Sequence, residues 1–392
     1  LATPSSFAPV VAVGEGRFYA FGGSEDGVAA SESTTVISRL DLSNPNPNLS
    51  TVSLTTSLPS QPNGTGWLTQ TANVIVADQQ YAGDVLLAGG GPVFPTIENG
   101  NISPTHATEK SYRFDPDTDT LTEVGSMNYA RFDHRSATLS TGEILVTGGF
   151  DKDGYPIDAI DIYNPDSGLW ATKTQGVETG SVFHAMARYG SEGVLVCGGL
   201  TAGDFPEYSD QCTLIRNTHE IEKTQPMEKA LLFTDLITLE DGRVLRTGGL
   251  DASDHEHTTF RPDNMRSTSG AAIFEDGVWR PLDASLKRAR AMHSTTLLPG
   301  GRVMIVGGVS GISSAHTAME ADYNGLLYDH AEALACVEIF DPESETFSLE
   351  DPSCQAMETE GTLPQRTLLA GVATDATYGT LIYGGVGSDR GD

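Results

Sequence analysis

Arginine and histidine residues recur shortly before several short apolar segments of this chain. The candidates for ligand binding are Arg131, His134, His184, Arg290, His293 and Arg366, with Lys229 at a similar position. Because arginine offers a planar set of N–H donors, such a group of cations suits an anionic or polyhydroxylated ligand. The same side chains could instead hydrogen-bond loop carbonyls and neutralise neighbouring carboxylates within the fold. The sequence leaves both interpretations open.

Two kinds of acidic segment offer ligands for a metal ion. His255 and His257 are two residues apart and follow Asp251 and Asp254, and on an extended segment both imidazoles could reach one divalent metal. The Asp-rich segments 115–119 and 151–154 offer the oxygen ligands that Ca²⁺ prefers, although neither matches an EF-hand loop. We therefore expect either solvated acidic loops or metal sites, with structural Ca²⁺ as the cofactor candidate.

The elements that must position these residues are clearest in the segment 125–174. Two strands meet at a Thr141-Gly142 turn, and the second of them stops at Gly148-Gly149. A third strand is predicted from Ala159 to Tyr163, and a fourth begins at Leu169. The pattern predicts a four-stranded antiparallel meander.

The diglycine that follows the second strand recurs along the whole chain, each time after a short apolar run such as ILVT or VLVC. The seven copies begin at Gly22, Gly89, Gly148, Gly198, Gly248, Gly307 and Gly384. A later turn, Asn164-Pro165-Asp166-Ser167 before Trp170, completes the motif. Diglycine and turn together resemble the kelch repeat of β-propellers.

The resemblance implies an all-β fold, a kelch-type β-propeller of four-stranded antiparallel blades formed by residues 1–392 as a single domain. Seven units favour seven blades, with six as the alternative, because the last unit supplies only two strands, expected at 368–374 and 380–383. The resemblance says little about function, since propellers serve as enzymes, binding modules and scaffolds.

The charge of the chain limits its partners. There are 53 acidic against 23 basic side chains, a formal charge of −30 and a pI near 4.4. A surface this acidic repels nucleic acid and anionic membranes, so we expect no nucleic-acid partner. No apolar run is long enough to span a bilayer, and we expect no membrane insertion. The first residues, Leu1-Ala2-Thr3-Pro4, fit a mature terminus left after removal of a signal peptide.

The four cysteines fall in or beside neighbouring predicted strands. Cys197 ends a second strand and Cys212 lies near the start of the next, while Cys336 opens a third strand and Cys354 follows the fourth. We predict the disulfides Cys197–Cys212 and Cys336–Cys354, each worth about 3 kcal/mol. This pairing favours an oxidising location, which is secreted, periplasmic or cell surface, with four buried free thiols as the alternative.

Two enzyme groups with propeller folds offer comparisons. The segment 293–308 is similar to repeats of the secreted galactose oxidase group, which holds copper with two tyrosines and two histidines. No adjacent Tyr-His pair occurs here, so the resemblance does not extend to copper-radical chemistry. Kelch-type sialic acid mutarotases act on an anionic sugar, and their task requires a carboxylate or histidine beside an arginine. The sequence identifies no such proton-transfer pair.

The sequence favours a secreted or cell-surface kelch propeller that binds a protein or a glycan through its loops, without catalysis. A long insertion at 309–334 is a contact candidate, either as a wall over one face or as a short helix within 315–335. The alternatives are a carbohydrate-active propeller enzyme, similar to the mutarotases, and a structural subunit of an extracellular assembly in which a partner completes the last unit.

Overall fold

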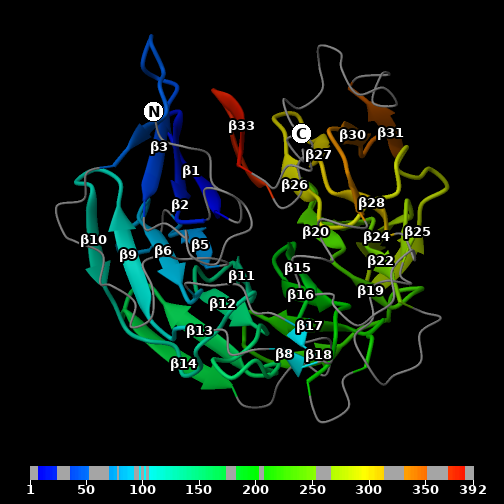
Figure 1. The fold of residues 1–392 in the computed structure, drawn as a ribbon, viewed down its shortest axis with the longest axis horizontal. Helices are drawn as coiled ribbons and strands as arrows, with labels where there is room; N and C mark the ends of the chain where they lie inside the picture. Colours follow the sequence, from blue (N-terminus) through cyan, green and yellow to red (C-terminus); the bar gives the residue numbers. More distant parts are fainter. Residues whose placement is uncertain are drawn as a thin grey trace. The chain divides into compact units, whose positions relative to one another are not determined.

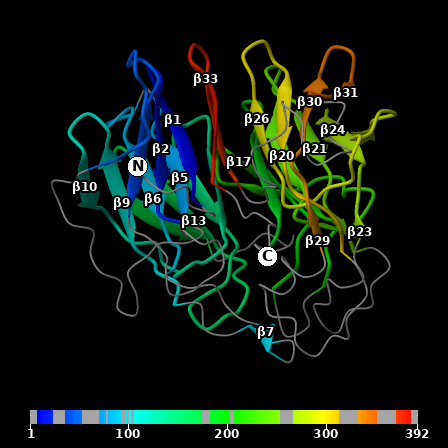
Figure 2. The same cartoon turned by 45° about the horizontal axis from the view of Figure 1, so that its top comes forward.

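The computed structural model describes residues 8–23, 36–52, 70–76, 79–91, 97–98, 101–102, 106–173, 182–202, 207–252, 266–312, 331–350 and 370–384. Every regular element in these ranges is a β-strand (Figures 1 and 2). The described part contains no helix that is long and apolar enough to cross a membrane. The chain divides into two compact units, the first formed by Leu1–Pro95, Pro104–Val177 and Gly371–Gly384, and the second by Thr96–Ser103, Glu178–Ala370 and Gly385–Asp392.

Unit 1 contains three four-stranded antiparallel sheets, called blades 1 to 3, and a two-stranded hairpin. Blade 1 is β1 (Val10–Gly14), β2 (Arg17–Phe21), β3 (Ile37–Asp41) and β4 (Ser50–Thr51), and blade 2 is β5 (Thr71–Val74), β6 (Val85–Ala88), β9 (Ser111–Asp115) and β10 (Thr120–Glu123). Blade 3 is β11 (Arg135–Thr138), β12 (Ile144–Thr147), β13 (Ile160–Asn164) and β14 (Leu169–Lys173), and the hairpin is β32 (Gly371–Asp375) and β33 (Gly379–Tyr383).

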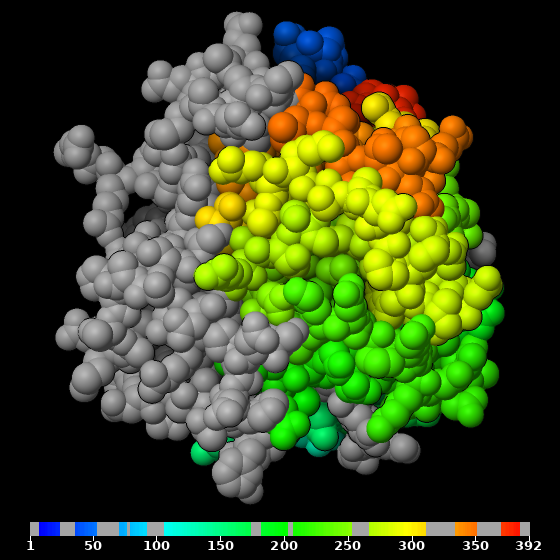
Figure 3. Space-filling model, turned by 90° about the vertical axis from the view of Figure 1, so that its right-hand side faces the viewer, coloured from blue at the N-terminus to red at the C-terminus, as the bar shows by residue number. Residues whose placement is uncertain are grey.

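Unit 2 contains blades 4 to 6. Blade 4 is β15 (Ala185–Tyr189), β16 (Gly193–Cys197), β17 (Cys212–Arg216) and β18 (Ile221–Lys223), and blade 5 is β20 (Asp235–Thr238), β21 (Val244–Thr247), β24 (Ala271–Glu275) and β25 (Val278–Pro281). Blade 6 is β26 (Ser294–Leu297), β27 (Val303–Val306), β30 (Val337–Asp341) and β31 (Thr346–Leu349). The yellow surface of 266–312 and the orange surface of 331–350 adjoin in Figure 3.

Short strands extend the loops outside the blades. They form the pair β7 (Ile97–Glu98) and β8 (Asn101–Ile102), the sheet of β19 (Leu231–Leu232), β22 (Leu250–Asp251) and β23 (Arg266–Ser267), and the pair β28 (Val309–Ile312) and β29 (Ala331–Ala333). The last residues of the 309–334 insertion are therefore extended, whereas 313–330 lie outside the described residues.

The first strands of consecutive blades lie side by side within each unit. In unit 1 the order is β32, β1, β5 and β11, and in unit 2 it is β15, β20 and β26. Apolar clusters fill the space between blades, for example Tyr19, Phe21 and Phe114 between blades 1 and 2. The hairpin β32–β33 therefore flanks blade 1 as another blade would (Figure 1).

Glycine is needed where the second strand leaves each sheet. Gly149 has a φ of 86°, and a Cβ there would lie 2.6 Å from the carbonyl oxygen of Phe132. The second glycine also joins consecutive blades, because the Gly90 N–H donates to the carbonyl of Arg131 at 2.8 Å and the Gly249 N–H to that of Arg290 at 2.8 Å. A side chain would therefore separate the strand end from the loop that it contacts.

The sheets confirm the predicted fold class, an all-β chain of four-stranded antiparallel meanders. The predicted third and fourth strands of blade 3 correspond to β13 and β14. The last unit is a two-stranded hairpin in the described chain, as predicted. The count of seven blades, with six as the alternative, stays a prediction.

Candidate functional site

Arg131 lies just before β11, and its side chain is fully buried. Its Nε and Nη2 donate to Oδ2 of Asp161 at 3.0 and 2.9 Å, and Nη1 donates to the carbonyl oxygen of Gly148 at 2.7 Å. Burial lowers the pKa of the Arg131 guanidinium, and the Asp161 carboxylate opposes that shift. The pair therefore joins the loop before β11, the end of β12 and strand β13 within one blade.

Blade 6 repeats this arrangement. The buried Arg290 donates from Nη1 to the Gly307 carbonyl at 2.7 Å and from Nη2 to Oε1 of Glu338 at 2.5 Å. Because both guanidinium groups are fully buried and bonded inside their own blade, contact with a ligand would require a buried ion pair to open. These contacts agree with the alternative in which the arginines hydrogen-bond carbonyls and neutralise carboxylates within the fold. Ligand binding by Arg131 and Arg290 stays a prediction.

Two of the predicted histidines, His134 and His293, join consecutive blades. His134 is buried, and its Nε2 lies 3.1 Å from the Ala88 carbonyl and 3.2 Å from Oγ1 of Thr71, both in blade 2. His293 in blade 6 places its Nε2 2.8 Å from Oγ1 of Thr247 in blade 5. Burial, with the nearby Arg290 charge, lowers the pKa of His293 to about 3, so the ring is neutral at physiological pH. His184 is also buried.

The residue before each of these histidines, and before Thr234 at the corresponding position of blade 5, has a left-handed backbone. The φ angles are 54° at Asp133, 58° at Phe183, 51° at Phe233 and 56° at Met292. In unit 2 the Phe233 N–H donates to the Phe183 carbonyl at 3.0 Å, and the Met292 N–H donates to the Phe233 carbonyl at 3.2 Å. Burial raises the pKa of the Asp133 carboxyl group to about 6.

Several predicted site residues lie outside the described residues, namely Arg366, Asp254, His255, His257 and Cys354. Of the predicted metal group only Asp251 is described, and its Oδ2 lies 2.5 Å from Nζ of Lys229. Within the described ranges, no three histidine, cysteine, aspartate or glutamate side chains come together as a metal-ligand group.

The Asp-rich segments form turns held by their own carboxylates. Asp115 accepts hydrogen bonds from the N–H of Asp117 at 2.8 Å and from Oγ1 of Thr118 at 2.7 Å. Asp117 pairs with Arg17 at 2.7 Å, and Oδ1 of Asp151 accepts the N–H of residues 153 and 155. Calcium binding at these loops stays a prediction.

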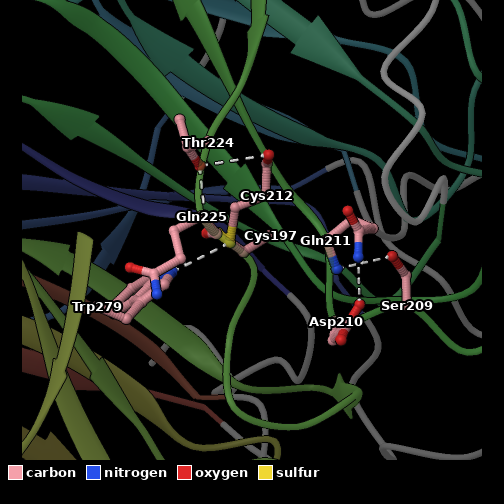
Figure 4. Close-up of a disulfide and its surroundings, with 8 residues drawn as sticks. All are labelled: Cys197, Ser209, Asp210, Gln211, Cys212, Thr224, Gln225 and Trp279. Carbon is pink, nitrogen blue, oxygen red and sulfur yellow. Dashed lines mark hydrogen bonds between the residues drawn. A yellow bond between two sulfur atoms is a disulfide. The ribbon is translucent and has the colours of Figure 1, made fainter. Parts of the chain in front are cut away.

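A disulfide joins Cys197, the last residue of β16, to Cys212, the first residue of β17 (Figure 4). The two cysteines are directly opposed across the strands, with Cα atoms 4.2 Å apart. Nε1 of Trp279 in blade 5 donates to Sγ of Cys212 at 3.3 Å. This confirms the first predicted bridge. Cys336 is also disulfide-bonded, and Cys354, its predicted partner, lies outside the described residues.

The first and last hairpins of unit 1 meet at their turns. The Gly16 N–H donates to Oδ2 of Asp375 at 3.2 Å. The Tyr378 ring lies against the same glycine, since a Cβ on Gly16 would be 2.8 Å from Cγ of Tyr378. These contacts join the β1–β2 turn to the β32–β33 turn.

A groove of about 790 Å³ opens between these two turns. Glu15, Ser43 and Thr377 line it with a carboxylate and two hydroxyl groups. Tyr378, which also lines it, is 41% exposed. The groove therefore combines an aromatic ring with several hydrogen-bond acceptors on one open surface.

Sequence reasoning missed this groove and one buried cation. The groove depends on contact between turns at opposite ends of the sequence, which no local pattern indicates. The cation is Arg246, which interrupts the apolar run VLRT of β21 and is 8% exposed. An arginine where the other second strands carry an apolar residue is the signal that could have identified it.

No protein-family model and no curated protein sequence matches this chain. Its structure is similar to that of YjhT, with a TM-score of 0.55 and 12% identity over 89% of this chain and 98% of that chain. It is also similar to a fungal alcohol oxidase of the AA5 family in complex with copper, with a TM-score of 0.62 and 15% identity over 98% of this chain and 75% of that chain. Together with the six four-stranded sheets, these likenesses show that the chain has the kelch-type β-propeller fold.

Proposed function

We propose that this protein is a binding module for a glycan, and that the groove between the β1–β2 and β32–β33 turns contributes to the binding surface. The observation that carries the proposal is the exposed Tyr378 ring beside the oxygen atoms of Glu15, Ser43 and Thr377. A binding module requires such a surface and no reactive group.

The chemistry of the groove suits a polyhydroxylated ligand. A tyrosine ring presents a rigid apolar face, against which the C–H face of a sugar ring can pack. Carboxylate and hydroxyl oxygens accept hydrogen bonds from sugar hydroxyl groups. Since the chain carries a formal charge of −30, we expect neutral or amino sugars to bind better than acidic ones.

The disulfide supports a location in an oxidising compartment, where such a ligand would be met. A protein partner and membership of a larger extracellular assembly are the other partners that the sequence suggests. The groove favours the glycan because carboxylate and hydroxyl groups line it beside a single aromatic ring.

Isothermal titration calorimetry with cello-oligosaccharides, chito-oligosaccharides and polygalacturonate tests this proposal. We expect saturable binding of a neutral or amino glycan, and at least a tenfold loss of affinity, about 1.4 kcal/mol, in Tyr378→Ala. Tyr155→Ala is the matched control, because Tyr155 is 70% exposed and does not line the groove. The proposal fails if none of the three glycans binds, or if the two variants bind alike.

A further inference from the structure

The Arg246 guanidinium lies at the end of the second strand of its blade, where Arg131 and Arg290 place theirs. Those two arginines come from the loop before the first strand, whereas Arg246 belongs to the second strand itself. It is the third residue of β21, where blade 3 has Val146 and blade 6 has Ile305. Its Nη1 donates to the carbonyl oxygen of Gly248 at 3.3 Å. Gly248 is the first glycine of the blade 5 diglycine, so its carbonyl corresponds to the acceptors of Arg131 and Arg290. The guanidinium therefore lies at the equivalent strand end.

Blade 5 lacks the carboxylate that accompanies this arginine elsewhere. In blade 3, Asp161 is opposite Val146 on the neighbouring strand, and in blade 6, Glu338 is opposite Ile305. At the same register Arg246 is opposite Ala272. Among the described residues, no carboxylate lies within ion-pair distance of Arg246.

The charge of this guanidinium has little compensation. Burial lowers the pKa of Arg246 to about 10, and the charge of Glu228, an exposed residue, opposes the shift. The group therefore still carries a proton at neutral pH. A buried cation without an adjacent anion is costly, which favours occupation of the nearby space by an anion.

A backbone donor faces the same space in the other blades. The Asp161 carboxylate accepts the Asn128 N–H at 3.4 Å, and the Glu338 carboxylate accepts the Lys287 N–H at 2.7 Å. Glu228 is the corresponding residue of blade 5. It follows Met227, whose N–H donates to the backbone carbonyl of Asp210. The preceding residues of blades 3 and 6 do the same, since the Met127 N–H donates to the Glu109 carbonyl and the Leu286 N–H to the Ser269 carbonyl.

We propose that blade 5 binds a small monocarboxylate ion, of the size of formate or acetate, between the Arg246 guanidinium and the Glu228 N–H. Ala272 has the Cβ of an aspartate but not its carboxyl group, so the missing group has the size of formate. The Arg246 side chain is 8% exposed, whereas Arg131 and Arg290 are fully buried. The arginine that has no internal carboxylate is thus the one of the three that is not completely closed off from solvent.

Thermal unfolding in sodium formate, compared with sodium chloride at equal ionic strength, tests the site. We expect the Tm of the wild-type protein to rise saturably with formate, by roughly 2 °C or more. In Arg246→Met the formate response should be lost, because the ligand has no cation to pair with.

Ala272→Asp supplies the carboxylate from the protein itself. This variant should have a higher Tm in chloride and no response to formate, whereas Ala272→Asn should lack the stabilisation because it carries no charge. An equal Tm of the wild-type protein in formate and chloride would overturn the proposal, and so would a formate response that persists in Ala272→Asp. The second measurement decides the matter even if Arg246→Met does not fold.

Discussion

Blades 5 and 6 are neighbours in unit 2, and both place a guanidinium on the carbonyl oxygen of the first glycine after the second strand. In blade 6 the arginine comes from the loop before the first strand and pairs with Glu338. In blade 5 it comes from the second strand itself and faces Ala272. In both blades the carbonyl of the first glycine accepts a hydrogen bond from the arginine. The residue of the third strand differs, because a glutamate neutralises the guanidinium in blade 6 and an alanine cannot do so in blade 5.

In blade 4 a disulfide, and not an arginine, joins the end of the second strand to the third strand. Its disulfide joins the last residue of β16 to the first residue of β17, directly beside the diglycine. The bridge lies one register position nearer the diglycine than the Arg246–Ala272 pair of blade 5. A covalent bridge, a single cation and a buried ion pair therefore lie at the same strand end in blades 4, 5 and 6. Their contributions to stability should differ, and the difference can be measured.

The largest effect is expected from Glu338→Ala, which gives blade 6 the residue type that blade 5 already has. Removing one partner of a buried pair leaves an uncompensated charge, so unfolding in urea should show a loss of about 3–5 kcal/mol. The control is Glu345→Ala, whose pair with Arg280 is partly exposed and should contribute about 1 kcal/mol or less. A similar cost for both variants would mean that blades 5 and 6 do not differ in the way described.

A smaller loss is expected when the blade 4 bridge is removed. In Cys197→Ala/Cys212→Ala the unfolded chain gains the freedom of a loop with a sequence separation of 15, worth about 3 kcal/mol. Urea unfolding of the variant against the oxidised wild-type protein measures this. If the variant and the wild-type protein unfold at the same urea concentration, the bridge makes no net contribution to the free energy of unfolding.

The smallest effect concerns pH. The pKa of His293 is about 3 in the folded protein and about 6.5 in the unfolded chain, so the unfolded state binds the proton first as the pH falls. His293 therefore contributes stability above pH 6.5 that is lost below it, by at most about 1.4 kcal/mol per pH unit.

The test is His293→Thr, which copies blade 5, where Thr234 has the corresponding position and donates to the carbonyls of Thr247 and Gly248. The difference in unfolding free energy between wild type and variant should decrease from pH 7 to pH 5. Asp84 and Asp133, whose carboxyl pKa values burial raises to about 6, titrate in both proteins and cancel in this difference. A difference that is constant with pH would contradict the neutral, buried state of His293.

The fold was predictable because its signals are local and repeated. The apolar run ILVT and the Gly148-Gly149 that follows it indicate where β12 ends, without reference to distant parts of the chain. The bridge between Cys197 and Cys212 followed from adjacent strands. The kind of contact that Arg131 makes was one of the two interpretations of the sequence. Its partner Asp161 was not predictable, because it is 30 residues away and was one acidic side chain among 53.

The groove could not be predicted for a different reason. Its lining brings Glu15 and Ser43 next to Thr377 and Tyr378, and only the packing of β32 against β1 creates that proximity. A repeat pattern gives the order of the units, but it does not say which side chains meet where the two ends of a series come together. Arg246 was missed because the run VLRT predicts a strand correctly, but the strand pattern does not indicate a role for the one charged side chain within it.

The position of the hairpin β32–β33 has a consequence for biosynthesis. Gly16 and Asp375 are bonded across 359 residues of sequence, and the Tyr383 and Ser38 hydroxyl groups are bonded across 345. The flank of β1 that β32 covers is therefore made early and covered only after residues 371–383 have left the ribosome. Contacts of such long range form slowly and leave apolar strands uncovered meanwhile, so completion of unit 1 should be the step most exposed to aggregation during synthesis.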